Sequence, residues 1–304
     1  MTKNVSIIIL HYTDKKLTMD CLNSIKELDK KNLKIEMIII NNNPQENLED
    51  LKKRFSTFTF LETGENLGFA EGNNVGIRYA LKNNADFVFL LNNDTLIDKN
   101  SLVRLIEAAD LDIRNGILGP KIYFAPGFEF HKNRYKKNER GKVIWYAGGT
   151  MNWQDVIARH RGVDEVDRGQ YEKIEETNFV SGCAMLIKKE VFEKIGLLDK
   201  NYFLYYEDND LCQRAKKAGF KIIFVPQAIV WHKNAGSSKS GSGLQDYYIS
   251  RNRLLFGLKY VSLQTKIALI RESIKLLFIG RQWQKKGIKD FYLRKLGKGS
   301  YEAN

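Results

Sequence analysis

Two clusters of acidic and amide side chains are the residues of this chain best suited to chemistry. Asp94 ends the run Asn92-Asn93-Asp94, directly after the apolar segment 87–91, whose β-prone residues predict a buried strand. Open α/β sheets bind ligands at the carboxyl ends of their strands. A carboxylate there is suited to holding Mg²⁺ or Mn²⁺, which prefer oxygen ligands. Glu207 and Asp208, which open a predicted helix, could supply a base.

Each cluster also has an ordinary structural explanation. Asn and Asp side chains commonly form turns after strands, and the helix macrodipole favours acids such as Glu207 and Asp208 in the first turn. Asp210 lies four residues before Arg214, a spacing that predicts an ion pair on the helix surface.

Alternating strand and helix patterns position these clusters. Such alternation predicts βαβ units and an α/β fold with a mostly parallel sheet, and a nucleotide site at its carboxyl edge. Residues 125–142 are polar and predict a surface loop, and Gly196 ends a predicted helix at 188–195. The strands are expected at 5–10, 35–40, 57–62, 87–91 and 116–123, and the helices between them at 17–28, 48–55, 73–83 and 101–109.

Six motifs in order along residues 4–260 resemble those of inverting glycosyltransferases of family 2, in the branch of rhamnosyltransferase-like enzymes. The resemblance implies a GT-A fold, a nucleotide-sugar donor, a divalent metal and a single displacement that inverts the anomeric carbon. The matching segments are 5–12 (VSIIILHY), 66–76 (NLGFAEGNNVG), 90–95 (LLNNDT), 179–186 (FVSGCAML), 205–211 (YYEDNDL) and 231–232 (WH).

The resemblance assigns roles to the acidic residues. Asp94 occupies the last position of the family's Asp-x-Asp motif, whose first acid is Asn92 in this chain. His232 would be a second metal ligand or would contact the diphosphate, although a buried histidine that ends a strand is the alternative. Asp208 is the expected base, with Glu207 as the second choice or as the residue that orients the acceptor.

Further matches are expected to bind the nucleotide sugar. An Asn41 carbonyl could accept the N3–H of uracil or thymine, so a UDP- or dTDP-sugar is the leading donor. Arg251 and Asn252 could contact the diphosphate or a lipid-linked acceptor, or simply lie on a helix surface. The expected nucleotide-sugar residues are His11, Tyr12, Thr13, Asn41, Asn42, Asn66, Gly68, Asn73, Asn93 and Arg251.

The positive charge is concentrated in the C-terminal part of the chain. Residues 236–304 hold fourteen Lys and Arg against four acids, and so carry +10 of the net +13. We expect a catalytic domain at 1–235, with a nucleotide-sugar half near 1–123 and an acceptor half near 124–235. A flexible lid at 236–243 and basic amphipathic helices at 244–260 and 265–278 would follow. Their apolar stripe and cations predict contact with an anionic membrane surface, and a solvated helical face is the alternative.

These patterns favour an enzyme of cell-surface glycan synthesis, with a lipid-linked or polysaccharide acceptor. With neither a signal peptide nor an 18-residue apolar run, a cytoplasmic, peripheral membrane location is expected. A nucleotidyltransferase is the first alternative, but it should carry a glycine-rich phosphate loop where residues 11–14 read HYTD. A nucleic-acid-binding protein is the second and is unlikely, because only the charge supports it. Cys21, Cys183 and Cys212 are too few and too far apart for a disulfide framework, and are expected to be packing residues.

Overall fold

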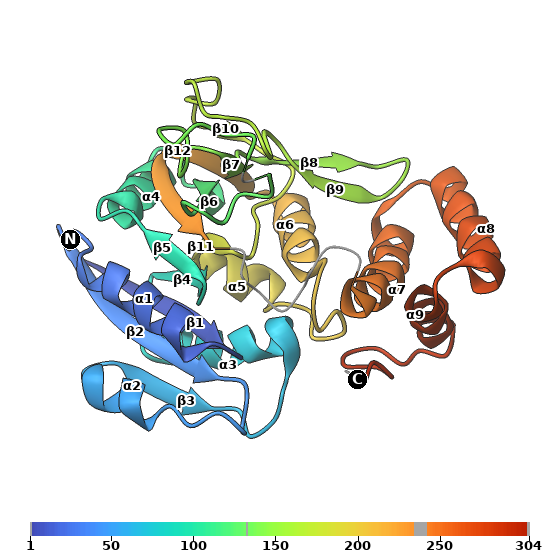
Figure 1. The fold of residues 1–304 in the computed structure, drawn as a ribbon, viewed down its shortest axis with the longest axis horizontal. Helices are drawn as coiled ribbons and strands as arrows, with labels where there is room; N and C mark the ends of the chain where they lie inside the picture. Colours follow the sequence, from blue (N-terminus) through green and yellow to red (C-terminus); the bar gives the residue numbers. More distant parts are fainter. Residues whose placement is uncertain (1, 132, 234–241, 303–304) are drawn as a thin grey trace.

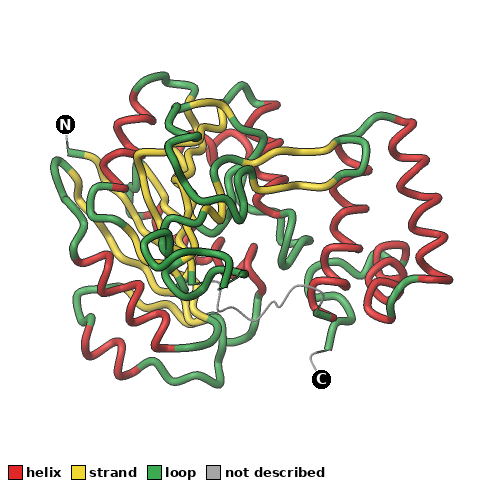
Figure 2. The backbone as a smooth tube through the Cα atoms, turned by 45° about the horizontal axis from the view of Figure 1, so that its top comes forward, coloured by secondary structure: helices red, strands yellow, loops and turns green. Residues whose placement is uncertain are grey.

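A computed structural model describes residues 2–131, 133–233 and 242–302. Its main body is built on a ten-stranded sheet in the order β10-β12-β6-β11-β4-β1-β2-β3, in which β5 also pairs with β12 and β7 with β6 (Figures 1 and 2). The strands are β1 Lys3–His11, β2 Leu33–Asn41, β3 Thr59–Glu62, β4 Phe87–Asn92, β5 Thr95–Ile97, β6 Asn115–Phe124, β7 Ile144–Tyr146, β10 Glu175–Glu176, β11 Ala184–Lys188 and β12 Lys221–His232.

Helices flank this sheet, and three more form the C-terminal part of the chain. Every strand and helix predicted before residue 124 is present, with shifted ends, so the α/β prediction is confirmed. The helices are α1 Lys15–Lys26, α2 Glu49–Arg54, α3 Gly68–Lys82, α4 Ser101–Asp110, α5 Lys189–Ile195, α6 Glu207–Lys217, α7 Gly243–Tyr260, α8 Leu263–Ile279 and α9 Gln282–Tyr292.

The strands β3, β2, β1 and β4 run parallel. Ile7, Ile8 and Ile9 of β1 are all fully buried, as expected where elements cover both faces of a parallel sheet. Helix α3 begins five residues earlier than predicted, because Gly68 adopts φ +75° and its N–H donates to Asn66 Oδ1 at 2.9 Å.

Two later strands bring distant residues to the carboxyl end of β4. Strand β11 lies antiparallel between β4 and β6, and the Asn92 N–H donates to the Cys183 carbonyl at 2.9 Å. Strand β12 runs parallel to β6 and pairs with β5 so that His232 lies opposite Thr95. Because Thr95 follows Asp94, this register places His232 beside the acidic turn.

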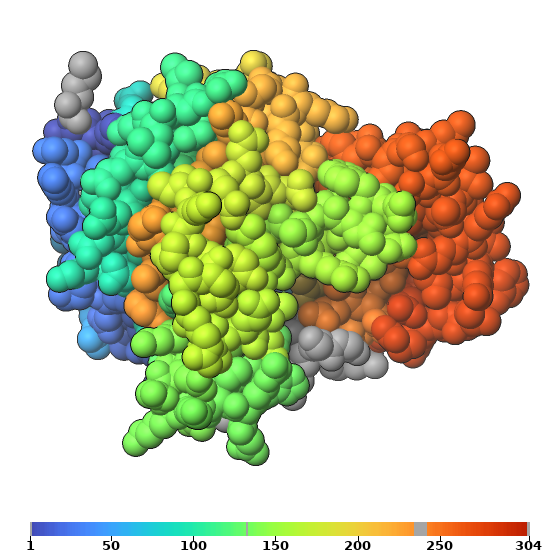
Figure 3. Space-filling view, turned by 90° about the horizontal axis from the view of Figure 1, so that it is seen from above, coloured from blue at the N-terminus to red at the C-terminus, as the bar shows by residue number. Residues whose placement is uncertain are grey.

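The C-terminal helices pack on one another beside the main body (Figures 1 and 3). The predicted helical extension is confirmed, although α9 was not predicted. The predicted lid lies outside the described residues except for Ser242 and Gly243, which begin α7. A two-stranded hairpin, β8 Gly149–Asn152 and β9 Ile157–His160, reaches the helices. There Arg253 Nε donates to the Asp155 carbonyl at 2.7 Å.

A small apolar core joins the C-terminal helices to the hairpin and to the segment before α6. Loss of one of its large side chains, such as Leu269, typically costs about 2–5 kcal/mol of unfolding free energy. The core consists of Met151, Val156, Tyr202, Tyr206, Leu254, Phe256, Leu269 and Ile288.

Helix α8 also exposes an apolar stripe. Its exposed fractions run from 37% at Ile270 to 76% at Phe278, whereas Leu269 and Ser273 on the opposite side are buried. Among the described residues, no helix is both long and apolar enough to cross a bilayer. The stripe comprises Leu263, Ile267, Ile270, Ile274 and Phe278.

Candidate active site

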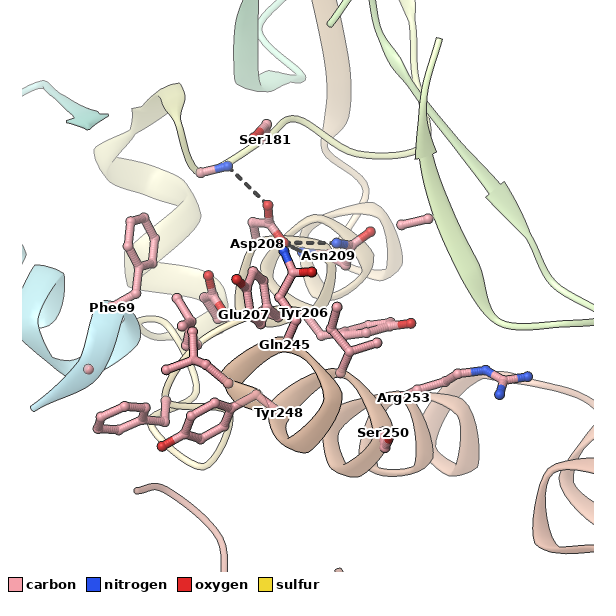
Figure 4. A pocket seen from close by; sticks show the side chains of 18 of the residues that line it. Phe69, Ser181, Tyr206, Glu207, Asp208, Asn209, Gln245, Tyr248, Ser250 and Arg253 are labelled. Carbon is pink, nitrogen blue, oxygen red and sulfur yellow. Dashed lines mark hydrogen bonds between the residues drawn. The ribbon is translucent and has the colours of Figure 1, made fainter. Parts of the chain in front are cut away.

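A cavity of about 2000 Å³ opens at the carboxyl ends of β1 and β4 and extends to α6 and α7. The turn after β4, the start of α3 and the start of α6 all contribute to its wall, and Figure 4 shows part of it. The predicted site residues that line it are Tyr12, Asn42, Asn66, Gly68, Asn93, Asp94, Glu207, Asp208 and His232.

Asp94 and His232 meet in the wall of this cavity. Asp94 Oδ1 lies 3.1 Å from His232 Nε2, and both side chains are less than one-tenth exposed. Asp94 Oδ1 has no hydrogen-bond donor among the described residues. Burial opposes ionisation of Asp94, but His232, a backbone N–H and Lys233 together outweigh it and lower the pKa of the carboxyl below the ordinary 3.8. An ionised oxygen beside an imidazole nitrogen fits a divalent cation.

Two further features bear on that cation. In the part of the chain that the structure describes, no three His, Cys, Asp or Glu side chains converge, so other ligands of the metal would be phosphate oxygens or water. The Trp145 ring packs edge-on against His232, with centroids 4.6 Å apart, and also against His160. Burial lowers the pKa of His160 to about 4, so this second imidazole adds no positive charge near neutral pH.

Asp208 and Glu207 lie at the start of α6, facing the sheet edge (Figure 4). The Gly182 N–H donates to Asp208 Oδ2 at 3.0 Å, and the Asn209 N–H and Nδ2 donate to Oδ1 at 2.7 and 2.8 Å. Asp208 is half-buried, whereas Glu207 is buried and its Oε2 has no hydrogen-bond partner among the described residues.

Burial raises the pKa of both carboxyls. For Asp208, hydrogen bonds from Gly182 and Asn209 oppose the rise, and the pKa stays above the ordinary 3.8. For Glu207, the negative charge of Asp208 adds to the effect of burial and holds the pKa well above 4.5. Divergent environments of two neighbouring carboxyls typically separate their roles. Here the hydrogen bonds from Gly182 and Asn209 favour the ionised form of Asp208, whereas burial and the charge of Asp208 favour the neutral form of Glu207.

The raised pKa of Glu207 predicts a stability effect. Because its folded pKa exceeds the unfolded value, its contribution to stability is full below about pH 4.5 and is lost as pH rises through the folded pKa. Glu207→Gln should therefore raise the melting temperature at pH 7.5 by roughly 2–4 °C, the scale of 1 kcal/mol for a domain of this kind, and less at pH 5. Scanning calorimetry at both pH values measures this, with the exposed Glu193→Gln as control. An equal shift at both pH values would contradict it.

The residues at the start of α3 are tied to the end of β2. Asn42 Nδ2 donates to Asn66 Oδ1 and to the Gly68 carbonyl at 3.2 Å each, and Asn42 Oδ1 accepts from the Leu67 N–H at 3.0 Å. An ideal Cβ at Gly68 would lie 2.4 Å from the Phe203 ring. Only glycine therefore permits both the positive φ and this close approach. Asn93 bonds to the Thr13 carbonyl and the Thr18 hydroxyl.

Five of the residues predicted to bind the nucleotide sugar do not line the cavity. His11 is fully buried between the Thr18 hydroxyl at 2.7 Å and Glu46 at 3.0 Å. Asn41 shapes its own turn, since Nδ2 donates to the Glu46 carbonyl and Oδ1 accepts from the Asn43 N–H. The hydrogen bonds of His11 and Asn41 therefore join residues that do not line the cavity. The five are His11, Thr13, Asn41, Asn73 and Arg251.

Two expectations about helix surfaces are wrong. The Asp210–Arg214 pair exists, with a 2.7 Å bond, but Asp210 is fully buried and also accepts from Lys259 at 2.6 Å and Tyr260 at 2.7 Å. Arg251 is likewise fully buried, because α7 packs on the segment before α6. The spacing of four residues predicted the Asp210–Arg214 ion pair, but it could not predict which side of α6 faces the interior.

Sequence reasoning missed several residues that hold the site together. Gly182 belongs to the matching segment 179–186, to which the sequence assigned no function. Its backbone N–H donates a hydrogen bond to Asp208. Asn209 directly follows Asp208 and hydrogen-bonds to it, and Trp145 packs on His232. A pattern could have suggested Asn209, but no local signal connects Trp145 or Gly182 to residues 26–87 positions away. The three cysteines are buried and unpaired as predicted.

Two solved structures show the same architecture. The chain superposes on GalNAc-T7 with UDP, GalNAc and Mn²⁺ at a TM-score of 0.64 and 15% identity, over 95% of this chain and 54% of that one. It superposes on the mannosyltransferase PcManGT of Pyrobaculum calidifontis, with GDP-Man and Mn²⁺, at 0.56 and 12%, over 98% and 76%. The fold is therefore the GT-A fold.

Sequence comparison gives the family. The model "Glycosyltransferase like family 2" matches residues 3–256, and the chain belongs to this family. It is 25% identical to the low-salt glycan biosynthesis hexosyltransferase Agl10 of Haloferax volcanii, over 84% of this chain and 76% of the relative. It is 28% identical to the N-acetylglucosaminyl-diphospho-decaprenol L-rhamnosyltransferase of Mycobacterium tuberculosis over 61% and 62%, and 23% identical to dTDP-rhamnosyl transferase RfbF of Shigella flexneri over 84% and 80%.

Proposed function

We propose that this chain transfers a sugar, with inversion, from a nucleotide diphosphate to a hydroxyl of a lipid-linked or glycan acceptor in cell-surface glycan synthesis. The arrangement of the cavity carries the proposal. The Asp94–His232 pair and the half-buried Asp208 lie in the wall of one cavity at the carboxyl edge of the sheet. A diphosphate site and a base site therefore open on the same space.

Each residue has a distinct role in this reaction. Asp208 accepts the proton of the attacking hydroxyl through its ionised carboxylate, which the Gly182 and Asn209 N–H groups orient. Asp94 and His232 would hold Mg²⁺ or Mn²⁺, which when bound would supply positive charge to neutralise the charge that develops on the departing diphosphate. Glu207 positions the acceptor by hydrogen bonding. Asn42, Asn66 and Gly68 form the wall next to the donor.

The name of one relative includes a dTDP-sugar and that of another a lipid diphosphate acceptor. We accordingly propose a dTDP- or UDP-sugar donor, rhamnose as the first sugar to test, and a polyprenyl-diphosphate-linked acceptor. Since Asn41 faces its own turn rather than the cavity, the pyrimidine preference rests on these relatives.

The test is a transfer assay on the full chain. Donors UDP-, dTDP- and GDP-sugars are offered with Mn²⁺ or Mg²⁺ and a short-chain lipid-diphosphate acceptor, and NMR of the product gives the anomeric configuration. We expect one pyrimidine donor to be used, with inversion. Release of free pyrophosphate without a glycosidic product would indicate a nucleotidyltransferase instead, and a retained configuration would contradict the single displacement.

The exposed stripe of α8 supports contact with an anionic membrane, where the acceptor lipid and a cytoplasmic, peripheral enzyme would meet. Arg271 and Lys275 flank the stripe on one side and Lys266 on the other, as follows from their helical positions. Apolar side chains bounded by cations fit a helix that lies in a lipid interface. Each such cation contributes about 1 kcal/mol near an anionic surface.

We expect the double variant Ile270→Glu, Ile274→Glu to lose sedimentation with liposomes that contain anionic phospholipid. The full-length protein should bind them, less strongly at high salt, and should bind neutral liposomes weakly. Ile113→Glu is the matched control, since Ile113 is 87% exposed outside the stripe. Equal sedimentation of the double variant and the control would contradict a membrane role for α8.

A further inference from the structure

The segment that precedes the base has an unusual backbone. Phe203, Tyr205 and Tyr206 adopt φ values of +64°, +69° and +74°. Residues other than glycine rarely adopt this left-handed backbone conformation. Such a conformation persists only where the surroundings enforce it. We call residues 202–206 the base loop, because Glu207 and Asp208 follow it directly.

The contacts that enforce this backbone come from helix α7. Asn252 Nδ2 lies 2.8 Å from each of the carbonyl oxygens of Tyr202, Leu204 and Tyr205. Its two hydrogens are shared among these three acceptors. Asn252 is fully buried, so water does not replace these bonds.

Arg251 completes the arrangement. Its Nε donates to Asn252 Oδ1 at 3.0 Å, which fixes the orientation of the amide so that Nδ2 faces the loop. Its Nη2 donates to the Tyr202 carbonyl at 2.9 Å. A buried guanidinium that bonds to carbonyls, rather than to a carboxylate, is here committed to holding the backbone.

The base loop also contacts the donor side of the cavity. The carbonyl of Phe203 accepts from the N–H groups of Phe69 at 2.7 Å and Ala70 at 3.2 Å, in the first turn of α3. The Phe203 ring stacks on Tyr248 of α7, with centroids 5.1 Å apart and an angle of 16°. One loop therefore joins α7, the donor wall and the base.

We infer that Asn252, held by Arg251, is a positioning residue for the base Asp208. It enforces the left-handed backbone of the base loop, which leads directly into the first turn of α6, where Asp208 lies. The inference rests on the proposed function of Asp208. Removal of the amide should let the loop relax toward ordinary backbone angles and move the carboxylate away from the Gly182 N–H, while Asp94 and His232 stay in place.

The test compares Asn252→Ala with Leu277→Ala, which removes from the core that also contains Tyr202 and Tyr206 a partly buried side chain of α8 that does not line the cavity. We expect Asn252→Ala to lower kcat tenfold or more, to change donor affinity in calorimetry less than twofold, and to shift the acid limb of the pH–kcat profile. Leu277→Ala should lower the melting temperature without these effects at 25 °C. Asn252→Ser, which keeps one donor, should give an intermediate kcat.

Three results would overturn the inference. They are a kcat of Asn252→Ala within twofold of Leu277→Ala, an unchanged acid limb, or donor affinity that falls in parallel with kcat. If Asn252→Ala does not fold, Asn252→Ser carries the same comparison. Failure of this inference can be distinguished from failure of the proposed function, because a wild-type protein without transfer activity would refute the proposed function. Active wild type with an inactive Asp208→Asn and a fully active Asn252→Ser would refute only the positioning role.

Discussion

Asp208→Asn is expected to lower kcat by roughly a hundredfold or more while leaving donor affinity within about twofold. The amide keeps the shape of the carboxylate but cannot accept the proton of the acceptor hydroxyl, and loss of a positioned base has about this cost. Steady-state kinetics with a saturating donor measure the effect, and calorimetry measures donor binding. Asp110→Asn, at an exposed site on α4, is the matched control.

The pH profile provides an independent check. Since burial raises the pKa of Asp208 above 3.8, wild-type kcat should fall on acidification at a higher pH than an ordinary aspartate would give. The residual activity of Asp208→Asn should lack that limb. If Asp208→Asn retains near-normal turnover and Glu207→Gln does not, the base is Glu207.

Asp94→Asn is expected to weaken Mn²⁺-dependent donor binding on the order of a hundredfold, because it removes the one carboxylate that the described residues place beside His232 and would leave the metal with neutral protein ligands. Donor titration by calorimetry with Mn²⁺, and again with EDTA, measures the change. In EDTA the variant and wild type should bind the donor about equally. The side chain lies in a turn, so the melting temperature should change little.

A result in the opposite direction is readily recognised. If donor affinity of Asp94→Asn in Mn²⁺ equals that of wild type, neither Asp94 nor the pair it forms with His232 holds a catalytic metal. His232→Gln separates the partners, since it removes the imidazole and leaves the carboxylate. Its donor affinity in Mn²⁺ should lie between those of wild type and Asp94→Asn.

Local sequence patterns predicted the parallel half of the fold well, for a physical reason. Buried strands such as β4 are short apolar runs, and the helices between them carry amphipathic periodicity, so each element is specified by neighbouring residues. The position of β11 between β4 and β6 is different. It depends on pairing with residues of β4 that lie 93–101 positions earlier and with residues of β6 that lie 68–70 positions earlier, and no period within the segment encodes that choice.

The candidate site likewise contains residues that local sequence patterns could identify and residues whose positions depend on tertiary packing. Asp94, Glu207 and Asp208 could be found because each stands at the end of a predictable element and matches a motif. The misplaced residues, Arg251 and Asp210, are charged side chains on helices whose buried faces are set by tertiary packing. For α7 the apolar periodicity is weak, and a buried arginine therefore looked like an exposed one.

The hydrogen bonds between α7 and the base loop join residues 47–50 positions apart. Contacts of that separation form only after the loop-closure entropy of the intervening chain has been overcome. During synthesis, the parallel strands β1 to β4 and the Asp94 turn can assemble from the first half of the chain, whereas the base loop gains its left-handed shape only once α7 has emerged and docked. Catalytic competence is thus the last property that the folding chain acquires, well after these parallel strands have paired.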